Sequence, residues 1–405
     1  MNFHFKYITC FIFVAAVISC RKPYSPPAVA LSGSYLVVEG VIDSGADTTL
    51  IKLSKTVKLS SAVTINPLSG AVVTVESDQG VVYPLTETAK GSYISPGLNL
   101  DNSRTYRLSI KTSTEQYLSD FEAVKNAPPV DSVAYTVQSD GVRIFANTHD
   151  PNNNTRYYRW DYTETWVFHS SFQSSWKSNG DTVVMRNQTT DQIYYCYKSD
   201  TSSTILLGSS AKLAADVISK APITSIAPHS DKLTEEYSIQ LKQYALTGAA
   251  YSFWQNLKTN TEKLGGIFDA QPSNISSNIH SVTNPSEPVI GYLSVGAVSN
   301  QRIFISSYPF PIFWTPDPYD DDCLLTSYLL AFYPTGGGGP INQENEFFNI
   351  NKGAHPPVPI PVQAIVDLAG EVVGHTGAPA ECVDCTLRGT NKQPSFWKVI
   401  NTTSR

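Results

Sequence analysis

Apolar and polar residues alternate in short runs over residues 34–126, which is the pattern of β-strands that bury one face. Glycine, asparagine and proline residues separate these runs at intervals of roughly 10 residues, and these residue types favour turns. Regularly spaced strand signals of this kind are typical of an antiparallel β-sandwich. The strands that the pattern predicts are 35–42, 48–53, 71–75, 81–85 and 105–110.

A second β-rich domain is predicted over 130–314, after a proline-rich linker at 127–129. Its last two apolar runs are expected to close the second sheet. Residues 163–235 are rich in Ser, Thr and Asn, and we expect long loops there. The expected strands of this domain are 130–135, 142–145, 157–162, 237–244, 289–295 and 301–305.

One segment of the second domain has the apolar spacing of a helix, and we predict a helix over 248–263. Thr247 precedes it as a candidate N-cap, and Gly265 and Gly266 are expected to end it. Its apolar stripe consists of Ala250, Phe253, Trp254 and Leu257. We interpret the stripe as a core contact, and ligand stacking on its aromatic rings is the alternative.

The first twenty residues have the pattern of a lipoprotein signal peptide. Lys6 precedes an apolar run of about a dozen residues, whereas a transmembrane helix needs roughly 20. The run ends in Ser19-Cys20, with an apolar residue three positions before the cysteine. We therefore expect residues 1–19 to be removed, Cys20 to carry lipid, and the proline-rich stretch 20–33 to serve as a tether.

Four further cysteines are predicted to form two disulfides in an oxidising compartment. Residues 315–405 are rich in proline and glycine, and we expect a coil-rich segment that needs such staples. Cys382 and Cys385 are expected to pair separately with Cys323 and Cys196, although the sequence leaves the individual pairing open. A metal or redox role for the Cys382–Cys385 motif is disfavoured, because neither matching ligands nor a thioredoxin-like unit is visible.

Charge and motifs exclude several classes of function. The chain has 29 basic and 35 acidic residues and a net charge of −6, without the clustered Lys and Arg that nucleic acids require. Zinc-protease, serine-hydrolase, phosphate-loop and dinucleotide-binding motifs are absent. The Asx-rich stretch 150–154 and the acidic cluster 320–322 are interpreted as a turn and a solvated loop rather than cation sites. We therefore predict no enzymatic activity, no cofactor and no metal, with the ligand unknown.

Two resemblances add to this interpretation. The order of strands and turns in 34–126, including a late TYRLSI run, resembles immunoglobulin-like and carboxypeptidase-regulatory-like modules, which implies an immunoglobulin-like sandwich. Segments such as LVVEGVI, DPNNNTRYYRW, YSFWQNL, VIGYLSVGAVS and ECVDC…NKQPSFW together resemble an uncharacterised lipoprotein family of Bacteroidota. Members of that family are commonly encoded beside TonB-dependent receptors, and no functional residues are established for it.

The resemblance implies an outer-membrane accessory of a nutrient-uptake system. Our leading hypothesis is a ligand-capture or lid subunit that works with a TonB-dependent receptor barrel, on either face of the outer membrane. The alternatives are a structural or adhesive surface lipoprotein and, less favoured, an enzyme that degrades polysaccharide or peptide.

The lipid anchor generates the first prediction. Replacing the acceptor thiol (Cys20→Ser) should release the protein from membranes, because a diacylated cysteine supplies the membrane affinity. Fractionation of cells, followed by immunoblotting of the membrane and soluble pools, measures the effect. An unchanged membrane fraction would show that Cys20 is not the anchor.

Overall fold

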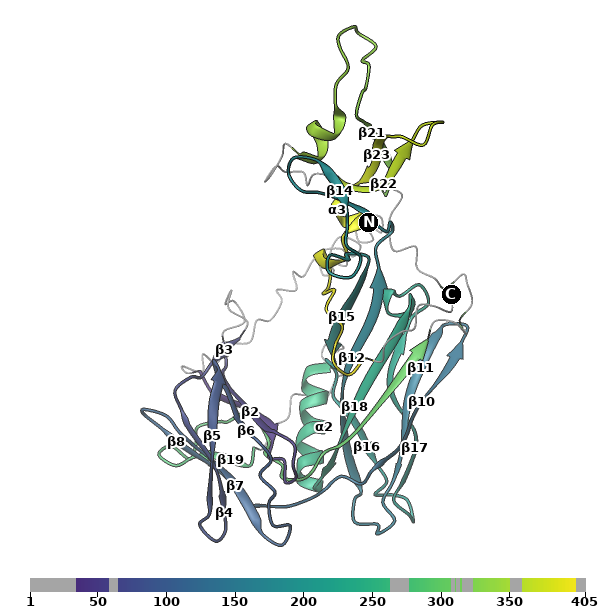
Figure 1. The fold of residues 1–405 in the computed structure, drawn as a ribbon. Helices are drawn as coiled ribbons and strands as arrows, with labels where there is room; N and C mark the ends of the chain where they lie inside the picture. The colour runs from purple at the N-terminus through teal and green to yellow at the C-terminus, as the bar shows by residue number, and fades with distance from the viewer. Residues whose placement is uncertain are drawn as a thin grey trace, which may run out of the picture.

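The protein is mainly β and consists of two β units and a C-terminal arm (Figure 1). The first unit comprises residues 34–126 and 277–297, and the second comprises 127–171, 194–262 and 298–306. The arm comprises 172–193, 323–349 and 359–384. The computed structural model describes residues 34–57, 65–262, 277–306, 310, 314, 323–349 and 359–397. The predicted signal peptide, Cys20, the tether and Gly265-Gly266 lie outside the described residues.

The first unit is a single hydrogen-bonded sheet of ten antiparallel strands in the order β1-β2-β6-β5-β4-β7-β8-β19, with β3 beside β2 and β9 beside β7. Its strands are β1 (Leu36–Val41), β2 (Thr49–Lys55), β3 (Asn66–Pro67), β4 (Val72–Ser77), β5 (Val82–Ala89), β6 (Ser92–Ser95), β7 (Thr105–Lys111), β8 (Gln116–Ser119), β9 (Glu122–Ala123) and β19 (Ile279–Ser281). The predicted strands are found here, and their alternating apolar residues form one core.

A late segment of the chain completes this first core. β19 pairs with β8, and residues 290 and 295 form parallel bridges with Val37 and Ile42. Val289, Leu293 and Val295 are buried in the core of the first unit. The expectation that 289–295 forms a strand of the second sheet is therefore wrong, because its apolar side chains cover the edge of β1 instead.

The second unit is a sandwich of two antiparallel sheets, with the orders β10-β11-β17 and β15-β12-β18-β20, and β16 also pairs with β12. Buried residues of both sheets share one core, which includes Ile144, Trp160 and Leu241. Its elements are β10 (Val130–Gln138), β11 (Gly141–His149), β12 (Tyr157–His169), β15 (Tyr195–Thr201), β16 (Leu206–Ser209), β17 (Val217–Ile226), the 3₁₀ turn η1 (Asp231–Leu233), β18 (Glu236–Leu246), α2 (Gly248–Glu262) and β20 (Ser299–Ser306).

The region expected to be looped contains strands. β12 continues to His169, and β15, β16 and β17 all lie within 163–235. Trp166 and Phe168 extend the apolar face of β12 into the core. Tertiary burial therefore outweighs the polar composition of these strands, whose outward positions carry the Ser, Thr and Lys residues.

The predicted helix is confirmed as α2. The Thr247 hydroxyl accepts a hydrogen bond of 3.2 Å from the Ala250 amide, as the expected N-cap. Ala250 and Phe253 are buried, whereas Trp254 and Leu257 are only half-buried. The helix lies beside β12 and β18, on the side of the second unit that faces the first (Figure 1).

The arm contains a hairpin and a three-stranded sheet of order β21-β23-β22 where coil was expected. Pro361 lies in β22, and Gly374 and Gly377 lie in β23. Because proline and glycine usually interrupt strands, the sequence pattern did not indicate this sheet. The elements of the arm and of the turn after it are β13 (Trp176–Ser178), β14 (Val183–Met185), β21 (Thr326–Leu329), the π-helical turn η3 (Asn345–Asn349), β22 (Ile360–Val366), β23 (Val372–Ala378), α3 (Ala380–Val383) and the 3₁₀ turn η4 (Cys385–Leu387).

Both expected disulfides are present, and each staples a different core. Cys323 pairs with Cys382 inside the small core of the arm. Cys196 of β15 pairs with Cys385, and both are fully buried in the core of the second unit. The pair Cys382 and Cys385 therefore connects the arm to the second unit within a few residues of chain.

The two disulfides should differ in what they stabilise. Removal of Cys196–Cys385 by a double Ser substitution should lower the free energy of unfolding of the second unit by about 2–5 kcal/mol, because it releases a long loop and leaves polar groups in a core. Removal of Cys323–Cys382 by the same change should expose the arm to protease and leave the main unfolding transition in place. Urea unfolding and limited proteolysis distinguish the two variants. Equal effects of both changes on the main transition would contradict this division.

Candidate functional site

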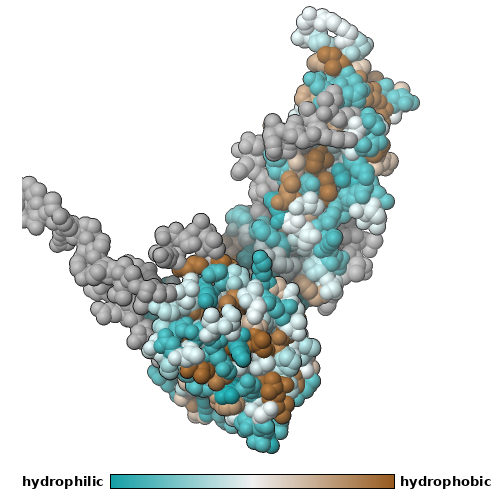
Figure 2. Space-filling view, turned by 90° about the vertical axis from the view of Figure 1, so that its left-hand side faces the viewer, coloured by the Kyte–Doolittle hydropathy of each residue, from teal (hydrophilic) through white to brown (hydrophobic). Residues whose placement is uncertain are grey.

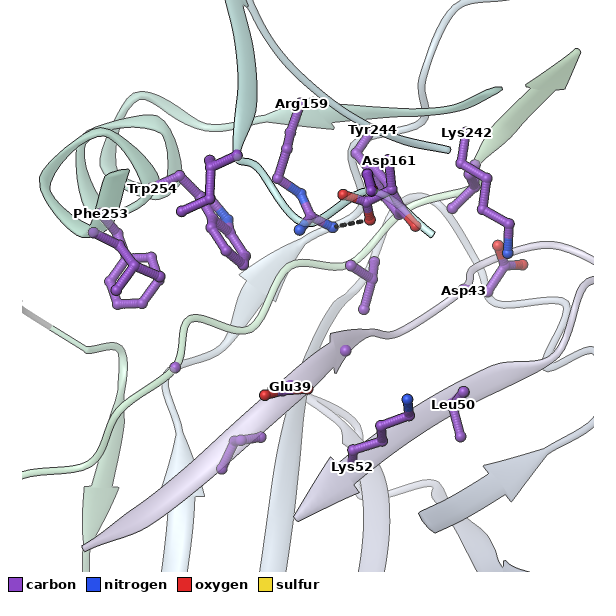
Figure 3. A pocket seen from close by; sticks show the side chains of 18 of the residues that line it. Glu39, Asp43, Leu50, Lys52, Arg159, Asp161, Lys242, Tyr244, Phe253 and Trp254 are labelled. Carbon is purple, nitrogen blue, oxygen red and sulfur yellow. Dashed lines mark ion pairs between the residues drawn. The ribbon is translucent and has the colours of Figure 1, made fainter. Parts of the chain in front are cut away.

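The best-formed cavity found in the described residues is a cleft of about 680 Å³ between the two units (Figure 3). β1 and β2 of the first unit provide one wall, and β12, β18 and α2 of the second provide the other. Strand side chains point alternately to the two faces of a sheet, so each wall consists of residues that point away from their own core. The cleft therefore brings together two outward-facing surfaces.

The first wall is an apolar strip with one pair of charges. Val41 lies opposite Leu50 in the register of β1 and β2, and Glu39 lies opposite Lys52. The side chains of Leu50 and Glu39 are exposed, whereas Val38 and Ile51 on the other face of the strand pair are buried. This exposure leaves both the methyl groups and the charges available to a ligand.

The second wall repeats this arrangement on β12 and β18. Arg159 lies opposite Tyr244, and Asp161 lies opposite Lys242. The intervening residue Trp160 points into the core and is 1% exposed, which fixes the outward direction of its two neighbours. Each wall thus carries an acidic residue directly opposite a lysine.

Arg159 is held at the centre of the cleft between two aromatic rings. Its guanidinium carbon lies 4.4 Å from the ring centroid of Tyr244 and 4.2 Å from that of Trp254. One terminal nitrogen is 3.1 Å from Asp161 Oδ2, and the side chain is 12% exposed. Its Nε is buried and has no hydrogen-bond partner among the described residues, so this donor can pair only with a water or ligand atom that enters the buried position.

The helix places its aromatic stripe between core and cleft. Phe253 is buried against Trp254 and against Tyr292 of the first unit, with ring centroids 5.4 and 5.5 Å apart. Trp254, Leu257 and Ile205 line the apolar end of the cleft. The core interpretation of the stripe thus holds for Ala250 and Phe253, and the other two residues lie where the stacking alternative requires them.

The opposite end of the cleft is acidic. Burial raises the pKa of the Asp43 carboxyl above its usual range, the neighbouring charge of Asp47 adds to this, and hydrogen bonds from backbone amides offset only part of the effect. Asp47 accepts a 3.2 Å hydrogen bond from Asn300 of the second unit. The cleft therefore runs from an acidic, hydrogen-bonding end to an aromatic end.

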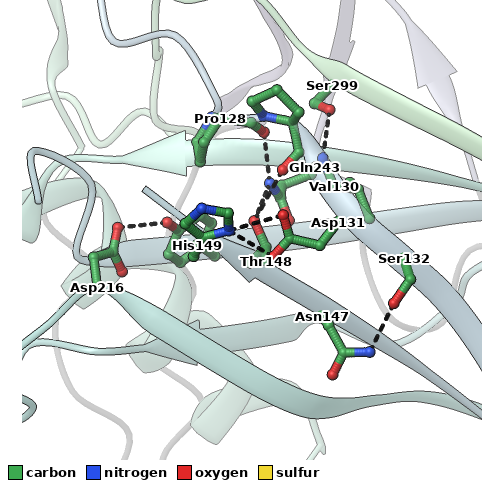
Figure 4. A network of polar contacts seen from close by, with 12 residues as sticks. Pro128, Val130, Asp131, Ser132, Asn147, Thr148, His149, Asp216, Gln243 and Ser299 are labelled. Carbon is green, nitrogen blue, oxygen red and sulfur yellow. Dashed lines mark hydrogen bonds and ion pairs between the residues drawn. The ribbon is translucent and has the colours of Figure 1, made fainter. Parts of the chain in front are cut away.

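A polar network holds the linker against the strands of the second unit (Figure 4). Gln243, fully buried in β18, donates to the carbonyl of Pro128 at 2.8 Å and to the Thr148 hydroxyl at 3.0 Å, and accepts from the Trp160 indole. The Val130 amide donates to the Ser299 hydroxyl at 3.1 Å. Buried and fully used polar groups of this kind fix one geometry.

The candidate cation turn binds its own backbone. Asp150 Oδ1 accepts from the amide of Asn152 at 3.0 Å, and Oδ2 accepts from the amides of Asn154 and Thr155 at 2.9 Å. In the described part of the chain no group of three or more His, Cys, Asp and Glu residues is placed to hold a metal ion. The cluster 320–322 lies outside the described residues.

The scattered histidines do not converge on the cleft. His149 pairs with Asp131 at 2.8 Å, and this hydrogen bond and charge raise the pKa of the histidine. His375 is buried in the arm, where its Nδ1 lies 2.6 Å from Glu344 and its ring contacts Trp176. The cysteines are likewise structural, because all four are consumed in the two disulfides.

The cleft residues on β12 and β18 were missed by sequence reasoning. Arg159 and Asp161 stand two residues apart in one predicted strand, and Lys242 and Tyr244 stand two apart in another, so each pair must share a face. This spacing could have been read from the sequence. The pairing of the two strands, and the position of the first unit opposite them, could not.

The fold and the cleft define a class: a mainly β protein of two units with a cleft between them. The chain belongs to the family described as domain of unknown function DUF4249, whose model matches residues 21–302. This range includes both walls of the cleft and excludes the whole of the arm's three-stranded sheet and the cysteines Cys323, Cys382 and Cys385.

Comparisons with individual proteins add little. No curated protein matches the chain. One similar solved structure is the Yersinia pseudotuberculosis adhesin InvE, at 13% identity and a TM-score of 0.14, with 52% of this chain and 55% of the adhesin chain covered. A similarity of this degree carries no argument about fold or function. Within the described residues, no helix has the length and apolar character needed to cross a membrane.

The Asp150 turn generates a prediction about pH. Burial alone would raise the pKa of Asp150, but the three backbone hydrogen bonds outweigh it, and the folded-state pKa is lowered. The stabilisation is therefore complete above the ordinary aspartate pKa of about 3.9 and is lost as the pH falls towards the lower folded-state value. Asp150→Asn should cost about 1–2 kcal/mol at pH 7, and its difference from the wild type should shrink below about pH 4.

Urea unfolding at pH 7, 5 and 3.5 measures this difference. The exposed Asp78, changed to Asn in the same way, serves as the matched control and should have no effect at any of these pH values. A constant cost of Asp150→Asn across the series would show that the carboxylate charge is not what the turn uses.

Proposed function

We propose that the protein is an outer-membrane lipoprotein that captures a small solute in the cleft between its units, as an accessory of a TonB-dependent nutrient-uptake system. The observation that carries the proposal is the clamped Arg159, with an unused donor inside an apolar and aromatic cleft. Clefts lined by apolar walls and a few convergent polar groups are the usual form of ligand sites.

The chemistry of the walls indicates an amphipathic solute of little net charge. The acidic residues of the cleft are Glu39, Asp43, Asp47 and Asp161, and the basic ones are Lys52, Arg159 and Lys242. Because these charges nearly balance, a strongly anionic or cationic ligand gains little from them. A solute with an apolar or flat portion would stack at Trp254, with its polar groups towards the acidic end.

The location rests on the N-terminal sequence. The lipobox ends at Cys20, where a lipidated mature protein would start, and the family match begins at the next residue. A lipid anchor keeps a capture protein beside its membrane. We propose a partner barrel because the family resemblance implies one. We also propose no enzymatic activity, because among the described residues that line the cleft no nucleophile is paired with a base in the manner of known hydrolases.

The test compares two readouts on full-length protein from native membranes. The tagged wild type, extracted in mild detergent, should yield a TonB-dependent barrel in stoichiometric amounts and a bound small molecule by native mass spectrometry. Trp254→Ala should retain the barrel and weaken solute binding by about tenfold or more, since it removes the stacking surface. Arg104→Ala, on an exposed turn of the first unit, is the control and should retain both.

Recovery of the wild type without any barrel and without a solute would overturn the proposal. A barrel without solute would support a lid role rather than capture. Catalytic turnover of a polysaccharide or peptide by the wild type would replace the proposal with the enzymatic alternative.

A further inference from the structure

The arm carries the densest exposed apolar surface of the described chain. Ten of the 25 large hydrophobic side chains that are exposed lie between Leu324 and Val372. Leu324 and Tyr333 expose 69% and 68% of their surface, and Leu368 is fully exposed. Several of these side chains appear as brown surface on the upper arm in Figure 2. Scattered apolar residues are ordinary, but their concentration on one small body marks an interaction site.

The charge of the arm's two later segments has one sign, and the two basic residues of its first segment, Lys177 and Arg186, are paired with Asp191 and with backbone carbonyls. In the described ranges 323–349 and 359–387 there is no Lys or Arg, whereas Glu346, Glu371 and Glu381 are exposed there. An acidic border opposes anionic lipid headgroups, and it opposes a second copy of the same surface. It complements a surface that presents Lys and Arg around an apolar centre.

The arm is also organised in advance of any contact. Cys323–Cys382 joins the start of its sheet to α3, and Val362, Ala378 and Val383 pack around the bond. Beneath the sheet, His375 and Glu344 form a buried pair against Trp176. A preformed surface loses little conformational entropy on binding, so its apolar area contributes more to affinity.

We infer that the arm is a docking surface for a protein whose contact face is an apolar recess bordered by Lys and Arg. The inference goes beyond the proposed function, because it concerns a surface outside the cleft and would hold for any solute. The arm's acidic border would steer the partner, and its leucine and aromatic side chains would provide the buried centre.

The test places the photo-crosslinking amino acid p-benzoylphenylalanine at Tyr333 in the full-length lipidated protein and irradiates native membranes. The same amino acid at Val72, a residue of β4 that is 64% exposed, is the matched control. We expect one discrete protein adduct at position 333 and none at 72. The adduct should fall by about fivefold in the variant Glu346→Lys/Glu371→Lys, and also when NaCl is raised from about 0.05 to 0.3 M.

Asp78→Lys, on the first unit, controls for charge reversal and should leave the adduct unchanged. Equal resistance of the arm to limited proteolysis in wild type and double variant establishes that the arm is folded, and the salt series tests the charge dependence without any mutation. An adduct with lipid alone, an adduct of twice the protein's own mass, the absence of an adduct, or one insensitive to both charge and salt would each overturn the inference. Because the cleft variant Trp254→Ala should leave this adduct intact, failure of the cleft proposal and failure of the docking inference are distinguishable.

Discussion

The chain passes between its two β units at 126–127 and again at 297–298, and the geometry of the cleft depends on hydrogen bonds between these two neighbouring crossings. The amide of Lys125 donates to the carbonyl of Val295 at 2.8 Å, and that of Ala127 donates to Ala297 at 3.0 Å. Asn126 accepts from the Ala297 amide and from the Ser44 hydroxyl, each at 2.7 Å. The strands are so close at Gly296 that a Cβ there would lie 1.9 Å from the Lys125 carbonyl oxygen. Two neighbouring crossings of this kind restrict the rotation of one β unit relative to the other. A single linker would permit that rotation.

This constraint turns two ordinary sheet faces into a site. The outward faces of β1–β2 and β12–β18 carry mixed apolar and charged residues, as solvated faces of antiparallel sheets usually do. Facing each other, they partly desolvate their charges, and Coulomb interactions strengthen as the local dielectric falls. Burial raises the pKa of Asp43, and the Nε of Arg159 is buried where Tyr244 and Trp254 of its own wall clamp the guanidinium.

The sequence predicted local elements well and long-range placement poorly. Alternation located β1, β2, β4, β7 and β18, and the stripe around Phe253 located α2, because these signals depend only on neighbouring residues. The two-disulfide arrangement followed from cysteine count and compartment. By contrast, 289–295 was assigned to the wrong unit, since its apolar pattern fits any strand edge. The sheet of the arm was concealed by Pro361, Gly374 and Gly377. Arg159 and Tyr244 could not be brought together without the strand register, which local patterns leave open.

Both units are closed by residues that come late in the chain. The first core contains Ile279 and Val295, although its other strands end near residue 123, and the second core contains Cys385, bonded 189 residues back to Cys196. A chain that emerges from its N-terminus therefore lacks part of the first core until residue 295 has appeared, and part of the second until residue 385 has. Non-local contacts of this kind delay folding. The first unit can therefore reach its final form only after residue 295 has been made, and the second only after residue 385.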